Sequence, residues 1–220
     1  MRELAPGVLQ LSGFPPNSIN VYVIDGVLID ASTRYAGRRI LRQAKGREIV
    51  AHALTHAHPD HQGASHRVCE ELGIPFWVGA GDADAAENPD LISERQPSHP
   101  VAQFFDRVCT GPGHRVDRQL REGDTVGSFT VLDVPGHSAG HVAFWRESDR
   151  VLVAGDVFNT ANPFTGLPGL RLPYDFFTPD PEENRRSAKR LSALEPSLLL
   201  VGHGPPLRDP RKLADFSSGL

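Results

Sequence analysis

Short apolar runs separated by polar turns recur along this chain and predict a series of strands. Runs of this length, bounded by Gly, Pro, Asp or Asn, are typical of strands that are buried in a core. The Asp25-Gly26 pair between two of the runs predicts a tight hairpin turn. The predicted strands cover residues 7–11, 19–24, 27–30, 49–55, 74–78, 129–134, 151–154 and 198–201.

Helical spacing of apolar residues separates several of these runs. It covers 35–44, 62–72 and 181–194, and the second of these segments is ended by Gly73. Glu182 and Glu183 lie in the first turn of the third, where the helix dipole favours acidic side chains. This mixture predicts an α/β fold in which two sheets pack face to face with helices outside, a four-layer αββα sandwich. We expect one domain over residues 1–220.

A cluster of polar residues follows the apolar run 49–55 directly. It reads His56-Ala57-His58-Pro59-Asp60-His61 and places three imidazoles and a carboxylate on one loop. Imidazole and carboxylate groups bind zinc and neighbouring divalent metals at roughly 2.0–2.2 Å. The loop therefore predicts one half of a metal site, presented at the end of a strand.

Further ligand-type residues follow later strands and lie beside glycines. Pro135-Gly136-His137-Ser138-Ala139-Gly140-His141 follows the run 129–134, and Gly155-Asp156 follows 151–154. Gly202-His203-Gly204 follows 198–201. Glycines on such loops let the backbone approach an ion closely. The pattern of a strand followed by a ligand therefore repeats along the chain.

Together, the motifs HxHxDH, PGHSxGH, GD and GHG, in this order, resemble those of the metallo-β-lactamase-fold hydrolase superfamily. The resemblance spans Ile19 to Pro206 and supplies the expected sheet topology. It implies that one metal is held by His56, His58 and His137, and a second by Asp60, His61 and His203. Asp156 would bridge the two ions, and for His141 the resemblance implies a hydrogen bond behind the ligands.

Two divalent ions in such a site would activate water for hydrolysis. We expect zinc, with iron or manganese as alternatives, and a shared water whose pKa falls from about 15.7 toward 7. Asp60 is the candidate catalytic group that assists proton transfer to the leaving group. The chain has neither GxSxG nor GxxxxGK[ST], so nothing supports a serine hydrolase or a nucleotide-driven enzyme.

Two segments rich in aromatic residues and proline are expected to form the substrate pocket. The first, 88–113, resembles a lid around a helix at 101–108 and carries Phe104 and Phe105. The second, 159–181, follows Asp156 and carries Phe176 and Phe177. An apolar wall with a few polar groups is typical of a small-molecule site. The weaker candidates for hydrogen bonds to a carbonyl oxygen are Asn159 and Tyr174.

The charge and composition of the chain limit the kinds of partner that we expect it to bind. The net charge of −4 and the pI of about 6.2 argue against a nucleic-acid binder, so a small-molecule substrate is expected. No apolar stretch reaches the roughly 20 residues of a membrane span, and the start lacks a signal-peptide pattern, so we expect a cytoplasmic protein. Nothing in the sequence specifies an oligomeric state. We expect Cys69 and Cys109 to be buried thiols. We expect ordinary structural or surface roles for four further histidines: His52, His66, His99 and His114.

Within the superfamily, the sequence after Asp156 disfavours some subclasses. Residues 157–161 read Val-Phe-Asn-Thr-Ala and lack the glycine and cysteine of glyoxalase II and the persulfide dioxygenases. Little sequence follows Pro206, where glyoxalase II has a helical domain, and no arm for tRNA processing is evident. Acyl-homoserine-lactone lactonases share the motifs but have a tyrosine where this chain has Asn159.

The expected reaction is therefore cleavage of a lactone, thioester, aryl ester or phosphoester. A secreted antibiotic-degrading lactamase would need a signal sequence, and the first residues of this sequence do not predict one. Two other classes remain open: an iron-dependent oxygenase or redox enzyme on the same ligands, and a non-catalytic metal-binding sensor. Metal analysis and oxygen consumption would distinguish the first from a hydrolase.

Overall fold

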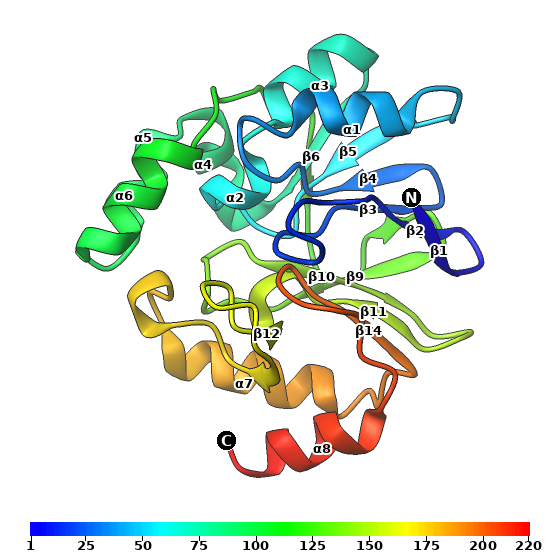
Figure 1. The fold of residues 1–220 in the computed structure, drawn as a ribbon, viewed down its shortest axis with the longest axis vertical. Helices are drawn as coiled ribbons and strands as arrows, with labels where there is room; N and C mark the ends of the chain where they lie inside the picture. The colour runs from blue at the N-terminus through cyan, green and yellow to red at the C-terminus, as the bar shows by residue number, and fades with distance from the viewer.

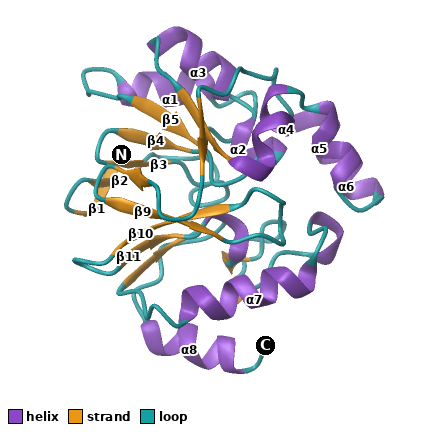
Figure 2. Cartoon of the chain, turned by 180° about the vertical axis from the view of Figure 1, so that it is seen from behind, coloured by secondary structure: helices purple, strands orange, loops and turns teal.

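In a computed structural model that describes residues 1–220, two β-sheets pack face to face between outer helices (Figures 1 and 2). Helices α1 (Gly37–Ala44) and α3 (Ser65–Leu72) cover one sheet, and α7 (Pro181–Ser192) and α8 (Pro210–Ser218) cover the other. The predicted four-layer αββα sandwich is confirmed. No helix combines the length and apolar character needed to cross a membrane.

The first sheet has seven strands in chain order. Strands β1 to β4 pair antiparallel, and β4 to β7 pair parallel. The predicted turn between β3 and β4 is present, because Ile24 pairs with Val27 while Asp25 and Gly26 adopt φ of 46° and 83°. The strands are β1 (Arg2–Ala5), β2 (Val8–Gln10), β3 (Tyr22–Ile24), β4 (Val27–Ile29), β5 (Ala51–Ala53), β6 (Phe76–Gly79) and β7 (Arg118–Leu120).

The second sheet has five strands in the order β14-β11-β10-β9-β8, with β11 and β14 parallel and the other pairs antiparallel. Apolar side chains from both sheets, among them Ile29, Phe129 and Phe144, fill the layer between them. These strands are β8 (Thr125–Val126), β9 (Phe129–Asp133), β10 (Val142–Arg146), β11 (Val151–Val153) and β14 (Leu198–Leu200), and a separate hairpin joins β12 (Asn159–Ala161) to β13 (Pro168–Arg171).

Several predicted boundaries are wrong for identifiable reasons. The helix predicted at 62–72 is two helices, α2 (Pro59–Gln62) and α3, because Ala64 between them leaves the helical conformation, with φ of −101° and ψ of 6°. The strand predicted from Ile19 begins at Tyr22, because Asn20 donates its backbone N–H to the carbonyl of Gly202. Both cysteines are buried free thiols, as predicted.

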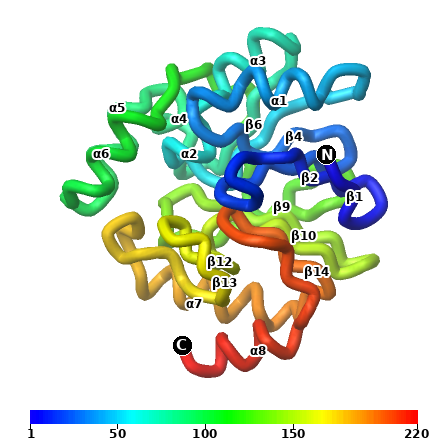
Figure 3. Tube along the Cα trace, in the orientation of Figure 1, coloured from blue at the N-terminus to red at the C-terminus, as the bar shows by residue number.

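The loops that carry the candidate ligands lie at one edge of the two sheets. They follow the carboxyl ends of β5, β9, β11 and β14. The helices of the predicted lid project at the same edge, as does the segment after β12 (Figure 3). Short helices complete the chain: η1 (Ala80–Asp82), α4 (Ala83–Glu87), α5 (Asp90–Arg95), α6 (Pro100–Cys109), η2 (Gly155–Val157) and η3 (Asp175–Phe177).

Candidate metal centre

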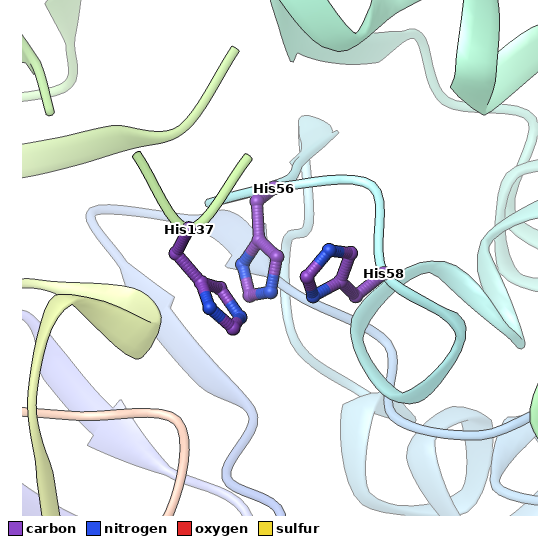
Figure 4. A group of neighbouring side chains, drawn as sticks. All are labelled: His56, His58 and His137. Carbon is purple, nitrogen blue, oxygen red and sulfur yellow. The ribbon is translucent and has the colours of Figure 1, made fainter. Parts of the chain in front are cut away.

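The structure brings the first predicted ligand group together from two loops. His56 and His58 follow β5, His137 follows β9, and their imidazoles point toward one another (Figure 4). One ring nitrogen of each lies within 4.8 Å of those of the other two. All three residues are buried. Three converging imidazoles of this kind can hold one divalent ion.

The second predicted group, Asp60, His61 and His203, lies next to the first. Its ligand atoms also lie within 4.8 Å of one another. His203 Nε2 is 3.2 Å from Asp60 Oδ2, and His61 Nε2 is 3.9 Å from the same oxygen. Residues from α2 and from the loop after β14 therefore meet although they are far apart in the sequence.

The carboxylate of Asp156 lies between the two groups. Its Oδ1 is 3.5 Å from His61 Nε2, while its Oδ2 is 3.1 Å from His203 Nε2 and 3.8 Å from His137 Nε2. One carboxylate thus faces histidines of both groups, which is the position that a bridging ligand requires.

Hydrogen bonds to Asp30 and Thr55 orient the rings of His56 and His61. His61 donates from Nδ1 to Asp30 Oδ2 at 2.9 Å. The Thr55 hydroxyl donates to the same carboxylate and accepts from His56 Nδ1 at 3.0 Å. Both imidazoles are thereby held as the tautomer that leaves Nε2 free to bind a metal.

The other two histidines that face Asp156 are oriented in the same way. The Thr178 hydroxyl donates to the carbonyl of Tyr174 and accepts from His137 Nδ1 at 3.1 Å. His203 donates from Nδ1 to the backbone carbonyl of Ser18. In each ring, Nε2 is therefore the nitrogen that faces Asp156.

Hydrogen bonds to Asp82 and a close contact at Gly202 bring the ligand-bearing loops together. Asp82 accepts hydrogen bonds from Ala57 N, Ser138 Oγ and Gly140 N, and so joins the two loops that carry the first group. Gly202 packs against the bridging carboxylate, because a Cβ there would collide with Asp156 Oδ1. Only glycine fits this position without displacing Asp156.

The electrostatics of the centre suit a bound cation. Burial lowers the pKa of His56 and His137 well below the ordinary value, so both rings are neutral and keep a lone pair. Burial alone would lower the pKa of His203, but Asp156 and Asp60 raise it to about 10. Burial alone would raise the pKa of Asp156, but the neighbouring His203 and His61 hold it well below its usual range. Asp156 is therefore ionised, as a carboxylate that binds a cation must be.

Buried polar atoms without a partner test whether the residues fit metal ions. His56 Nε2, His61 Nε2 and Asp156 Oδ1 have no hydrogen-bond partner. Buried polar atoms are normally satisfied, and orphaned ones point to a ligand or ion. Each of these atoms belongs to a ligand group described above. The donor set, rich in imidazole with two carboxylates, therefore fits a pair of divalent ions.

His141 packs against the first group. Its ring lies 4.6 Å from that of His56, centroid to centroid, and the hydrogen bond expected for it stays a prediction. Gly155, at φ +53°, makes room for it, since a Cβ there would lie 2.5 Å from His141 Nε2. His141 thus acts on His56 through packing.

A cavity of about 130 Å³ opens beside the ligands, and the aromatic segments form much of its wall. Of the predicted substrate residues, Asn159, Tyr174, Phe177 and Phe105 line it. Phe104 does not line it and is 62 % exposed. Phe176 does not line it either, since its ring stacks on His99 at 4.4 Å and on Tyr174 at 5.0 Å.

The lid and the second aromatic segment meet across this cavity. The ring of Phe105 on α6 lies 5.8 Å from that of Phe164 and 5.9 Å from that of Phe177. Such distances are typical of edge-to-face aromatic pairs.

Sequence analysis did not single out the residues that support the ligands, among them Asp30, Asp82 and Thr178. Asp30 follows β4 as Asp156 follows β11, so its place at a strand end was the available signal. Asp82 and Thr178 follow no such pattern, because they lie in a short helix and in the turn after η3.

Comparison with known proteins agrees with this geometry. The sequence model of the metallo-beta-lactamase superfamily matches residues 14–203. The chain belongs to the metallo-β-lactamase superfamily. It is 30 % identical over 231 residues to the probable metallo-hydrolase YflN of Bacillus subtilis, covering 93 % of this chain and 86 % of that protein. The chain is accordingly a metal-dependent hydrolase.

Solved structures and a second relative extend the likeness. A metallo-beta-lactamase family protein of Thermus thermophilus, TTHA1429, has a TM-score of 0.71 at 25 % identity, covering 99 % of this chain and 80 % of that one. TTHA1623 in a di-iron-bound form has a TM-score of 0.66 at 31 % identity, covering 99 % and 98 %. The hydroxyacylglutathione hydrolase of Bdellovibrio bacteriovorus is 30 % identical over 70 % of this chain but only 48 % of its own length.

Proposed function

We propose that this protein is a binuclear metallo-hydrolase that cleaves an ester-like bond in a small molecule, with thioesters and lactones as the first classes to test. The observation that carries the proposal is the position of Asp156, whose two oxygens face His61 on one side and His203 and His137 on the other. A pair of divalent ions held there would lower the pKa of a shared water toward about 7 and polarise the attacked carbonyl or phosphoryl oxygen.

The protein's own residues supply orientation and proton transfer. Asp60 is 24 % exposed, faces the cavity and lies 3.2 Å from His203 Nε2, so it is placed to take a proton from the attacking water and pass it to a leaving group. Burial alone would raise the pKa of Asp60, but neighbouring His61 and His203 lower it, which keeps the carboxylate ionised and able to bind a cation.

The cavity wall supports a substrate with an apolar acyl or leaving group. Phe105, Phe164 and Phe177 line it beside the ligands. Asn159 buries an unpartnered Oδ1 in the same wall, and the Tyr174 hydroxyl accepts from Asn162 Nδ2 at 2.8 Å, leaving its own proton to donate. A mostly apolar wall with a few polar groups favours small molecules.

Zinc is the first metal to test, because the donors are mostly imidazoles. The di-iron form of TTHA1623 supports iron as the second candidate. Purified protein should retain two ions per chain after dialysis against a weak chelator. A panel of thioester, lactone, aryl ester, phosphoester and β-lactam substrates, assayed with each metal, tests the reaction.

Asp156→Ala is the decisive variant. It should abolish hydrolysis and weaken retention of both ions, because it removes the one carboxylate that both groups share. Retention of a single ion by the wild type, or a metal-replete and active Asp156→Ala, would refute the binuclear assignment. Oxygen consumption with iron but no hydrolysis would favour an oxidase or oxygenase instead.

A further inference from the structure

A second cluster of metal-ligating side chains lies between α3 and the segment 110–117, outside the centre described above. His66 and Glu70 are four residues apart on α3, so they share one face of the helix. His114 reaches them from the segment 110–117, which follows lid helix α6. Nothing in the sequence places His114 beside α3, so the sequence alone indicates only ordinary structural or surface roles for the two histidines.

The distances within this cluster approach those of a tetrahedral zinc site. His114 Nδ1 lies 3.2 Å from His66 Nδ1 and 3.8 Å from Glu70 Oε1. All three ligand atoms lie within 4.8 Å of one another. Zinc bonds of about 2.0–2.2 Å at tetrahedral angles place neighbouring ligand atoms about 3.3 Å apart. A small rotation of the Glu70 side chain, which is 62 % exposed, would bring its oxygen to that distance.

The two imidazoles face each other through the same ring nitrogen. Their Nδ1 atoms face each other, so without an ion only one of them can carry the proton between them. A neutral imidazole beside a carboxylate binds transition metals well.

We propose that His66, Glu70 and His114 bind a single divalent transition-metal ion, with zinc as the probe, and that water completes its coordination. The ion would tie the segment 110–117 to α3. That segment is already attached to α4, because His114 N donates to Ala86 O and Val116 N donates to Glu87 Oε1. Since α6 precedes it directly and carries Phe105, the ion would hold the base of the lid that lines the cavity.

Zinc alone is the probe, and the full chain is the sample. In crystals soaked in zinc, anomalous difference density should lie between His66 and His114, apart from any density at His56. Equilibrium dialysis of the wild type should give one more zinc per chain than the His66→Ala or Glu70→Gln variants give, with affinity at that site reduced roughly tenfold or more.

Glu71→Gln is the matched control. It removes a carboxylate from the same helix, but Glu71 pairs with Arg67 at 2.8 Å and lies outside the cluster. This variant should bind zinc like the wild type. Both cluster variants should keep hydrolysing whatever substrate the wild type cleaves, so failure of this proposal is separable from failure of the proposed function. No density at His66 and His114 at millimolar zinc, or equal zinc binding by wild type and His66→Ala, would overturn it.

Discussion

Replacing Asp30 with asparagine should disable one metal ligand without touching a ligand atom. Asp30 Oδ1 accepts from Thr55 N at 2.8 Å, and its Oδ2 accepts from His61 Nδ1 at 2.9 Å. An asparagine must keep its oxygen toward the Thr55 amide, which turns its NH₂ group toward His61. The imidazole then has to accept at Nδ1 and carry its proton on Nε2, the atom that faces Asp156.

The magnitude follows from the loss of this orienting bond. Replacing a group that orients a metal-binding histidine costs roughly 10–100-fold in metal affinity or activity, about 1.4–2.7 kcal/mol. The expected loss falls on the ion held by Asp60, His61 and His203, so at limiting free zinc Asp30→Asn should retain one ion where the wild type retains two. Competition with a chromogenic chelator measures both affinities.

Asp117→Asn is a suitable control, because Asp117 also accepts a backbone N–H, from Phe76, but lies away from the centre. This variant should bind both ions like the wild type. If a folded Asp30→Asn held both ions with wild-type affinity, the proposed control of the His61 tautomer would be refuted.

Three further predictions address packing, pH and the cavity. Gly202→Ala should lower the free energy of unfolding by about 1–3 kcal/mol and release both ions, because its Cβ would collide with Asp156. Denaturant unfolding measures the loss of stability, and metal analysis measures the loss of ions. Burial lowers the pKa of His52 to about 4. In the unfolded chain this histidine takes up its proton at a higher pH than in the folded protein, so the free energy of unfolding should fall by about 3 kcal/mol between pH 6.5 and 4. In His52→Gln, the free energy of unfolding should lack this part of the pH dependence. Phe177→Ala should reduce the preference for longer acyl chains by about fourfold per methylene, because each buried methylene contributes about 0.8 kcal/mol. Phe104→Ala should leave this preference unchanged, since Phe104 is exposed. Unchanged chain-length selectivity in a folded, metal-replete Phe177→Ala would show that other residues recognise the acyl chain.

The layered fold could be predicted from the sequence because its strands are strongly patterned. Runs such as 151–154 and 198–201 are apolar throughout, which is typical of strands covered on both faces. The candidate ligands could be located because each group follows a predicted strand, and His137, Asp156 and His203 also lie beside glycines. Less regular strands escaped prediction: β7 reads Arg-Gln-Leu and pairs only with β6, so its place in the sheet depends on contacts that no local pattern records.

The supporting residues of the centre could not be predicted, because their roles depend on pairs that are distant in the sequence. Thr178 orients His137 across 41 positions, and Ser18 accepts from His203 across 185. Local periodicity carries no information about such contacts.

The bonds that join the two halves of the chain also connect folding to metal binding. Asn20 Nδ2 donates to the carbonyls of Val201 and Gly204, and the Tyr22 hydroxyl donates to that of Val201. These bonds fix the loop of His203 against the first sheet, while Asp82 fixes the loop of His137 against that of His58. The ligand groups therefore exist only when the two sheets are packed together. Ions that bind this folded arrangement stabilise it by mass action, so removal of metal should lower the resistance of the whole sandwich to unfolding, and not that of one loop alone.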